Sequence, residues 1–153
     1  MPQKITPFLW FDNNAEEAVT FYMSIFKNSK ILHTSRNGEG GSVLVMRFEI
    51  EGQEYMALNG GPIYKFNESI SFMIDCETQE EVDYYWERLT DGGKPIQCGW
   101  LTDKFGLTWQ VTPRQLGELM SDPDPAKSGA VMKAMMGMVK IEIAGLQAAY
   151  DSA

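Results

Sequence analysis

The sequence is poor in residues that bind metals or form disulfides. Among 153 residues it has one histidine, His33, and two cysteines, Cys76 and Cys98. The cysteines lack CxxC spacing and no histidine accompanies them, so we expect free thiols in a reducing compartment rather than a zinc knuckle or a disulfide framework. One histidine cannot build a metal site, and we interpret His33 as a surface or groove residue.

Basic residues and long apolar runs are also scarce. Thirteen Lys and Arg face twenty-one Asp and Glu, which gives a net charge of -8. This charge repels nucleic acid phosphates and anionic lipid headgroups, so neither partner is expected. No run approaches the roughly 20 apolar residues that span a bilayer. The first residues show no signal-peptide pattern, and we therefore predict a cytoplasmic protein.

The remaining composition is that of a compact protein. Hydrophobic residues make up 44% and charged residues 22% of the chain, which is ordinary for a globular domain. A chain of this length can bury roughly 70% of its unfolded surface without a stabilising metal or disulfide. We predict one domain over residues 1–153.

The first part of the chain, about residues 4–60, predicts the order β-α-β-β-β. A strand over 5–11 ends at turn-forming residues, and a helix follows with Asn14 and Glu17 placed to cap its first turn. Ala18, Phe21, Tyr22 and Ile25 lie at helical spacing. Three strands are then predicted, over 30–35, 42–51 and 54–59, with a tight turn at Glu51-Gly52.

The same order recurs over about residues 68–112. A strand over 69–76 precedes a capping box, Thr78 to Glu81, which opens a helix that Asp91-Gly92-Gly93 ends. Short strands are predicted over 96–98, 100–103 and 107–112. An offset of 63 aligns Asp12 with Asp75 and Val19 with Val82, so the repeated order indicates an internal duplication.

Beyond residue 112 the pattern becomes helical, over about 113–151. A short helix over 113–120 is followed by a second one, with Asp124 as N-cap and Pro125 at its first position. One apolar stripe then extends through Val131, Met132, Met135, Met136, Val139, Ile143, Leu146 and Tyr150. Gly137 and Gly145 mark a bend or a break. Two interpretations stay open: a helix docked on its own domain, or one exchanged across a dimer.

Alternation along the predicted strands separates two faces. One is almost wholly apolar and should pack beneath the helices: Pro7, Leu9, Phe11, Tyr55, Ala57, Ile70, Phe72, Ile74, Leu107, Trp109 and Val111. The other mixes hydroxyl groups, an amide and large apolar groups: Thr6, Phe8, Trp10, Met56, Leu58, Ser69, Ser71, Met73, Thr108, Gln110 and Thr112. The mixed set suits a concave face around a ligand. A solvated outer sheet face is the alternative.

Several runs sharpen this picture into a family resemblance. They are 59–62 (NGGP), 66–72 (FNESISF), 79–86 (QEEVDYYW), 98–110 (CGWLTDKFGLTWQ) and the tail from Asp122 to Ala148. Together they resemble the vicinal oxygen chelate (glyoxalase/bleomycin resistance/dioxygenase) superfamily, in its PhnB-like branch, named 3-demethylubiquinone-9 3-methyltransferase. The resemblance implies an α+β fold, two β-α-β-β-β modules forming a cupped mixed sheet, and a homodimer.

The resemblance also locates four metal-ligand positions, which map onto Thr6, Met56, Ser69 and Gln110. Superfamily members that chelate a divalent ion place histidines and glutamates there, whereas these side chains are poor ligands for a hard cation. We therefore predict no metal site of the usual kind and no cofactor, although a divalent metal bound by other groups stays open. Methyltransferase activity is not expected, because no glycine-rich loop joins a strand to a helix with an acidic partner downstream.

A small-molecule site is the function that follows. The predicted ligand-binding residues are Thr6, Trp10, Met56, Ser69, Ser71, Trp100 and Gln110. Cys98 and Glu68 are the candidate catalytic groups, and Asp103 is a further candidate base if it is buried. Two hypotheses stay open: a lyase, isomerase or dioxygenase acting on a small oxygenated or aromatic metabolite, and a non-catalytic protein that sequesters a small molecule, as bleomycin-resistance relatives do.

Overall fold

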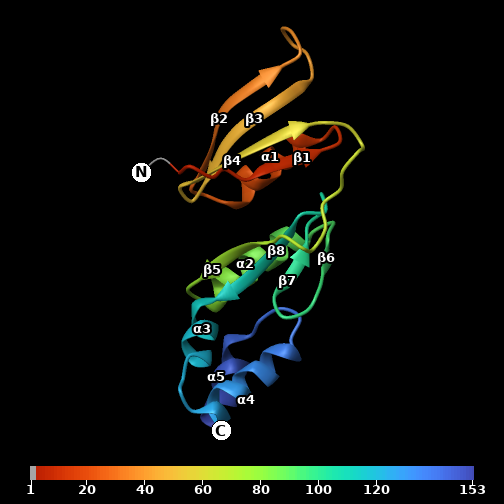
Figure 1. The fold of residues 1–153 in the computed structure, drawn as a ribbon. Helices are drawn as coiled ribbons and strands as arrows, with labels where there is room; N and C mark the ends of the chain where they lie inside the picture. The colour runs from red at the N-terminus through yellow and green to blue at the C-terminus, as the bar shows by residue number, and fades with distance from the viewer. Residues whose placement is uncertain (1–2) are drawn as a thin grey trace. The chain divides into compact units, whose positions relative to one another are not determined.

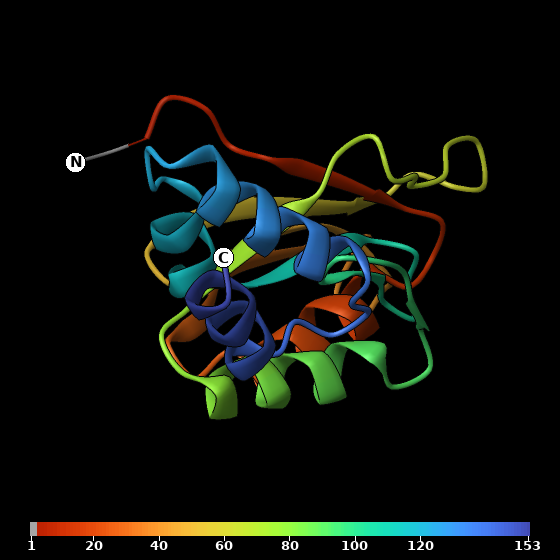
Figure 2. The ribbon, with the colours of Figure 1, turned by 90° about the horizontal axis from the view of Figure 1, so that it is seen from below.

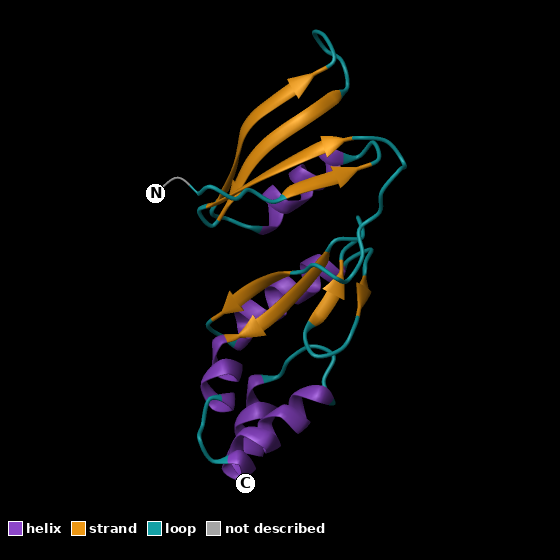
Figure 3. Cartoon of the chain, in the orientation of Figure 1, coloured by secondary structure: helices purple, strands orange, loops and turns teal. Residues whose placement is uncertain are grey.

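The computed structural model describes residues 3–153, which form two compact units. Unit 1 ends at Phe66 and unit 2 begins at Asn67. Each unit carries one four-stranded mixed sheet with helices (Figures 1 and 3). The predicted α+β class and the two β-α-β-β-β modules are confirmed.

Unit 1 follows the predicted order. Its elements are β1 (Phe8–Phe11), α1 (Ala15–Ile25), β2 (Ser29–Arg36), β3 (Val43–Ile50) and β4 (Gln53–Asn59). Sheet A has the strand order β1-β4-β3-β2, with β1 parallel to β4 and the other pairs antiparallel. Glu51 and Gly52 both have positive φ, at 50° and 81°, as the predicted tight turn between β3 and β4 requires.

The core of unit 1 lies between α1 and one face of sheet A. Ala18, Tyr22 and Ile25 are buried on α1, as their helical spacing predicts. Leu9, Phe11, Phe48 and Ala57 are buried on the strands. Alternation then places the side chains between them on the other face. We call that second face the open face of sheet A.

The β2–β3 hairpin carries two irregularities. The register skips Leu32 between Ile31 and His33, and it skips Leu44 between Val43 and Val45. Each skipped residue is a bulge, with one extra residue on one strand. Both leucine side chains are exposed.

Unit 2 repeats the topology and adds helices. Its module comprises β5 (Phe72–Cys76), α2 (Gln79–Thr90), β6 (Lys94–Pro95), β7 (Trp100–Thr102) and β8 (Thr108–Pro113). Sheet B has the order β5-β8-β7-β6, with β5 parallel to β8. The strand orders of the two sheets therefore correspond position by position, as the predicted duplication requires. The Thr78 hydroxyl accepts a hydrogen bond from the Glu81 backbone N–H (3.1 Å), so the predicted N-cap is confirmed, while the Glu81 carboxylate accepts from the Glu77 N–H (3.5 Å).

Three helices follow β8: α3 (Arg114–Met120), α4 (Pro125–Met136) and α5 (Ile143–Asp151). We call residues 114–153 the C-terminal extension. Helices α4 and α5 lie side by side (Figure 2). They enclose a small core of Val131, Ile141 and Leu146 with partly buried neighbours such as Leu119 and Met135. Within this chain the extension packs on its own unit. Its exchange across a dimer stays a prediction.

The apolar stripe breaks after Gly137, one of the two glycines predicted to mark a bend or a break, whereas Gly145 lies inside α5. Met132, Met136 and Val139 of the stripe are exposed. Other predicted details are wrong. The strand predicted over 96–98 is absent, and β6 lies earlier, at Lys94–Pro95. Strands β1 and β5 begin three residues later than predicted, and Ile70, predicted to be in the core, is 70% exposed.

Candidate functional site

The open face of sheet A changes from apolar residues on β1 to polar and charged residues on β3 and β2. Strand pairing aligns Phe8 with Met56, Met56 with Arg47, and Arg47 with His33. A second row aligns Trp10 with Leu58, Leu58 with Val45, and Val45 with Ser35. Residues paired in register share a face. The predicted grouping of Phe8, Trp10, Met56 and Leu58 is therefore correct.

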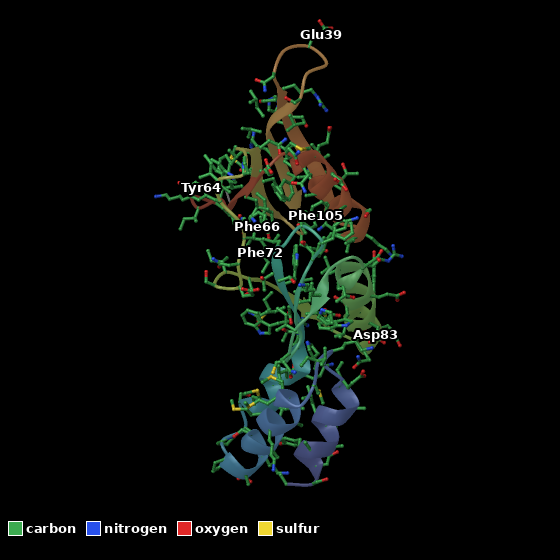
Figure 4. The ribbon with its side chains drawn as sticks, turned by 90° about the vertical axis from the view of Figure 1, so that its right-hand side faces the viewer. Glu39, Tyr64, Phe66, Phe72, Asp83 and Phe105 are labelled. Carbon is green, nitrogen blue, oxygen red and sulfur yellow. The ribbon has the colours of Figure 1, made fainter. Side chains whose placement is uncertain are left out.

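Trp10 is held in place by the loop after β4. Its indole N–H donates a hydrogen bond to the Gly61 carbonyl (2.9 Å). A Cβ on Gly60 would lie 2.3 Å from the indole ring, so the glycine backbone packs directly on Trp10. The Tyr64 ring meets Trp10 edge-on at 5.0 Å, and Figure 4 shows Tyr64 on the segment that follows β4. These contacts within unit 1 fix the orientation of the Trp10 indole.

Asn59, the first residue of the NGGP run, connects this loop to α1, a role that the sequence pattern does not indicate. Its side-chain oxygen accepts a hydrogen bond from the Ala15 backbone N–H (2.9 Å), and its amide donates to the Val43 carbonyl (3.1 Å). The predicted cap residue, Asn14, makes no side-chain capping bond. The cap therefore comes from the NGGP run, and only the fold brings that run to the helix.

The face of sheet B that carries Gln110 is more polar than the open face of sheet A, and we call it the open face of sheet B. The Gln110 side-chain N–H donates to the Ser71 hydroxyl at 2.8 Å. Strand pairing places Met73 on one side of Gln110 and Trp100 on the other. All four side chains are partly or fully accessible. An amide, a hydroxyl, a thioether and an indole thus gather on a single sheet face.

Three predicted ligand residues lie outside the strands: Thr6, Ser69 and Ser71, which directly precedes β5. Thr6 precedes β1 and is half-buried. Ser69 lies in a turn before β5, where both its backbone N–H (2.9 Å) and its hydroxyl (2.5 Å) donate to the Asn67 side-chain oxygen. In unit 2, Gln110 is consequently bonded to Ser71 and not to Ser69.

The candidate catalytic groups show no arrangement for proton abstraction. Glu68 is exposed. Asp103 is buried, but its carboxylate accepts hydrogen bonds from the Phe105 N–H (2.8 Å), the Leu107 N–H (3.1 Å) and the Trp109 indole (2.9 Å). Asp103 therefore shapes the turn before β8. Both carboxylate oxygens of Asp103 accept hydrogen bonds from its own turn or from Trp109.

The cysteines differ in environment. Cys98 is partly exposed and has a φ of 59°, in the left-handed region that L residues seldom adopt. Cys76 is buried, and burial, followed by the nearby Glu81 and Asp75 carboxylates, raises the pKa of its thiol to about 12. Cys76 is thus inert at neutral pH.

The donor set does not fit a divalent metal. Among residues 3–153, no three His, Cys, Asp or Glu side chains come together in a way that could hold an ion. The residues at the four mapped positions are Thr6, Met56, Ser69 and Gln110. Their side chains are weak ligands for a hard cation.

A hollow lies in the C-terminal extension, and none of the predicted ligand-binding or catalytic residues lines it. Its volume is about 520 Å³, and it is lined by Ala130, Lys133, Ala134, Gly137, Ala149, Ser152 and Ala153. Small side chains form most of its wall and few polar groups converge there. The sheet faces remain the better candidates.

Comparison with known proteins identifies the family. The family model described as 3-demethylubiquinone-9 3-methyltransferase matches residues 3–112. The chain belongs to this family. A PhnB protein from Bacillus cereus is 36% identical over 72% of this chain and 99% of its own, with a TM-score of 0.68. The predicted PhnB-like branch of the vicinal oxygen chelate superfamily is therefore confirmed. The match does not reach the tail, so the similarity of residues 122–148 stays a prediction.

More distant structures share the fold of this PhnB-like protein. Protein PA1353 from Pseudomonas aeruginosa is 20% identical, with 73% of this chain and 98% of that chain covered and a TM-score of 0.62. The fosfomycin resistance protein FosX from Listeria monocytogenes is also 20% identical, with 77% and 96% covered and a TM-score of 0.55. A search of curated proteins gave no match. Within residues 3–153, none of the helices has the length and apolar character to cross a membrane.

Proposed function

We propose that this protein binds a small oxygenated or aromatic metabolite on the open face of sheet B, with Gln110 and Ser71 as the orienting pair. The observation that carries the proposal is the 2.8 Å hydrogen bond between Gln110 and Ser71 beside Trp100. An amide can both donate and accept hydrogen bonds. Held by Ser71, the Gln110 side chain keeps its carbonyl oxygen and one N–H for a ligand.

An aromatic group gives this site its preference for planar ligands. Trp100 neighbours Gln110 on sheet B, and an indole offers a flat apolar wall. Unit 1 carries a separate aromatic wall on its own sheet A, where Gly60 and Gly61 hold Trp10 in place. A rigid aromatic group loses little entropy when it binds, which favours affinity.

Binding without turnover is the form of this function that the chemistry favours. The Ser71 hydroxyl is bonded to an amide, and no histidine or carboxylate among the described contacts activates it. A serine nucleophile requires such a base. The lyase, isomerase or dioxygenase alternative requires a proton acceptor or a metal, and the described donors fit neither.

Ligand-observed NMR with a panel of phenolic acids, catechols and hydroxyketones tests the proposal. We expect saturable binding that is unchanged by EDTA and leaves the ligand chemically intact. Gln110→Leu should weaken it about tenfold, the effect of losing one or two good hydrogen bonds, whereas the matched control Gln147→Leu, on the exposed side of α5, should not. If Gln110→Leu binds the panel as well as the unaltered protein does, the assignment of the site is wrong.

A further inference from the structure

The C-terminal extension contacts the segment that leads into β7. The backbone N–H groups of Cys98 and Gly99 donate to the carbonyls of Met138 and Val139, each at 2.8 Å. The extension lies beyond the residues that match the family model. Two consecutive carbonyls of the extension therefore bind the two consecutive N–H groups of the Cys98-Gly99 turn.

Gln79 binds the same part of the extension from the first turn of α2. Its side-chain oxygen accepts from the Ile143 N–H (2.7 Å), and its side-chain N–H donates to the Ile141 carbonyl (3.1 Å). One amide thus bonds both the donor and the acceptor of a short backbone segment. Beside it, Lys140 pairs with Asp83 at 2.8 Å, and Figure 4 shows Asp83 at the end of α2 that faces the C-terminal helices.

The turn that this contact holds is strained and closely packed. Cys98 and Gly99 are consecutive residues with positive φ, 59° and 83°. A Cβ on Gly99 would lie 2.8 Å from the Val111 carbonyl and 2.9 Å from the Ile141 side chain. A non-glycine residue in the left-handed region costs free energy, and the surroundings must hold it there. Ile141, which is fully buried, is part of those surroundings.

The turn also fixes Trp100. The Trp100 N–H donates to the Gln97 carbonyl (3.0 Å), and its carbonyl accepts from the Ile96 N–H (2.8 Å). Gly99 is joined to β8 through its carbonyl, which accepts from the Val111 N–H (2.8 Å). A shift at residues 98–99 is therefore transmitted directly to the side chain beside Gln110.

We propose that residues 138–143 act as a clasp that sets the Cys98-Gly99 turn and so positions Trp100 on the open face of sheet B, with Gln79 as the positioning residue. The consequence for ligand binding rests on the proposed function. The structural consequence does not, since it concerns the turn alone.

Amide hydrogen exchange of the full-length protein tests the clasp without a ligand. In Gln79→Ala we expect exchange of the Cys98 and Gly99 amides to rise about tenfold, because local opening loses the hydrogen bonds that the clasp supplies. The indole resonance of Trp100, assigned with Trp100→Phe, should shift, while that of Trp10 stays in place. The matched control Gln147→Ala should change neither readout.

Two outcomes would overturn the proposal. One is unchanged protection at residues 98–99 in Gln79→Ala while the amides of residues 141–143 lose theirs. The other outcome is measured on the unaltered protein, so it does not require the variant to fold. In low denaturant, the amides of residues 98–99 and 141–143 should exchange with the same dependence on denaturant concentration. Different dependences would contradict the clasp. Weak ligand binding with an intact clasp would count against the proposed function alone.

Discussion

At the scale of single residues, the runs that carry the family resemblance are explained by contacts that only the fold creates. The NGGP run is an example. Asn59 caps α1, Gly60 lies against the Trp10 ring, and the Gly61 carbonyl accepts the indole N–H. The run therefore serves both the helix start and the aromatic side chain of the open face.

Gly60→Ala should destabilise unit 1. The new methyl group would lie 2.3 Å from the Trp10 ring, and overpacking of this kind costs roughly 1–3 kcal/mol. Urea unfolding measures the change, and Trp10 fluorescence should shift with it. Gly129→Ala, where α4 leaves open space, is the control and should stabilise by about 0.5–1 kcal/mol. Equal stability of the two variants would contradict the contact with Trp10.

The two cysteines should differ in reactivity. Cys76 is buried and burial raises the pKa of its thiol to about 12, so almost none of it is thiolate at pH 8. Cys98 is partly exposed. We expect iodoacetamide at pH 8 to modify Cys98 and leave Cys76 intact, as judged by peptide mass spectrometry. Labelling of both in the folded protein would show that the environment of Cys76 is wrongly described.

Residue patterns alone reached part of this picture. Alternation placed Trp10, Met56, Met73 and Gln110 on the correct face, because strand periodicity depends only on sequence spacing. It could not show that Ser69 bonds to Asn67, or that Asp103 is occupied by its own turn. Those bonds depend on loop geometry, which periodicity does not encode.

At the scale of elements, the sequence predicted the order well and the ends poorly. Thr78 and Asp124 cap their helices as expected, because a cap is a local signal. The apolar stripe through residues 131–150 offered Gly137 and Gly145 as positions for a bend or a break, and the helix ends at the first of them. Its break after Gly137 is stabilised by Gln79, which lies 62 residues before Ile141, and a partner so distant in sequence leaves no periodic signal.

The Asp83–Lys140 ion pair should stabilise the fold only in the pH range where Asp83 is ionised and Lys140 is protonated. The hydrogen bond from Lys140, and then that from Gln79, lowers the pKa of Asp83, so this contribution is present above about pH 3.9 and lost at lower pH. The hydrogen bond to Asp83 raises the pKa of Lys140, so the contribution persists up to about pH 10.4 and is lost above it.

A double-mutant cycle with Asp83→Asn and Lys140→Met measures this pair. Both side chains are partly exposed, so solvent screening limits the coupling to about 0.5 kcal/mol at pH 7. Urea unfolding at pH 3 should give a smaller coupling, since Asp83 is largely protonated in the unfolded chain at that pH. A coupling that is the same at both pH values would exclude the ion pair as its source.

At the scale of the whole molecule, the family is established and the assembly is a prediction. The superfamily resemblance implies a homodimer, and Met132, Met136 and Val139 are exposed on the C-terminal extension. We expect sedimentation equilibrium to give twice the mass of the chain at micromolar concentration. A mass equal to one chain across that range would refute the dimer. The cytoplasmic location likewise stays a prediction.

The bulge at Leu32 bears on how an edge strand avoids pairing with a foreign chain. Strand β2 is an edge of sheet A and extends over eight residues, and long regular edges recruit further strands. The extra residue at Leu32 interrupts the regular row of N–H and C=O groups along β2, and Lys30 and Arg36 add charge to it. Both features disfavour the addition of another strand at this edge.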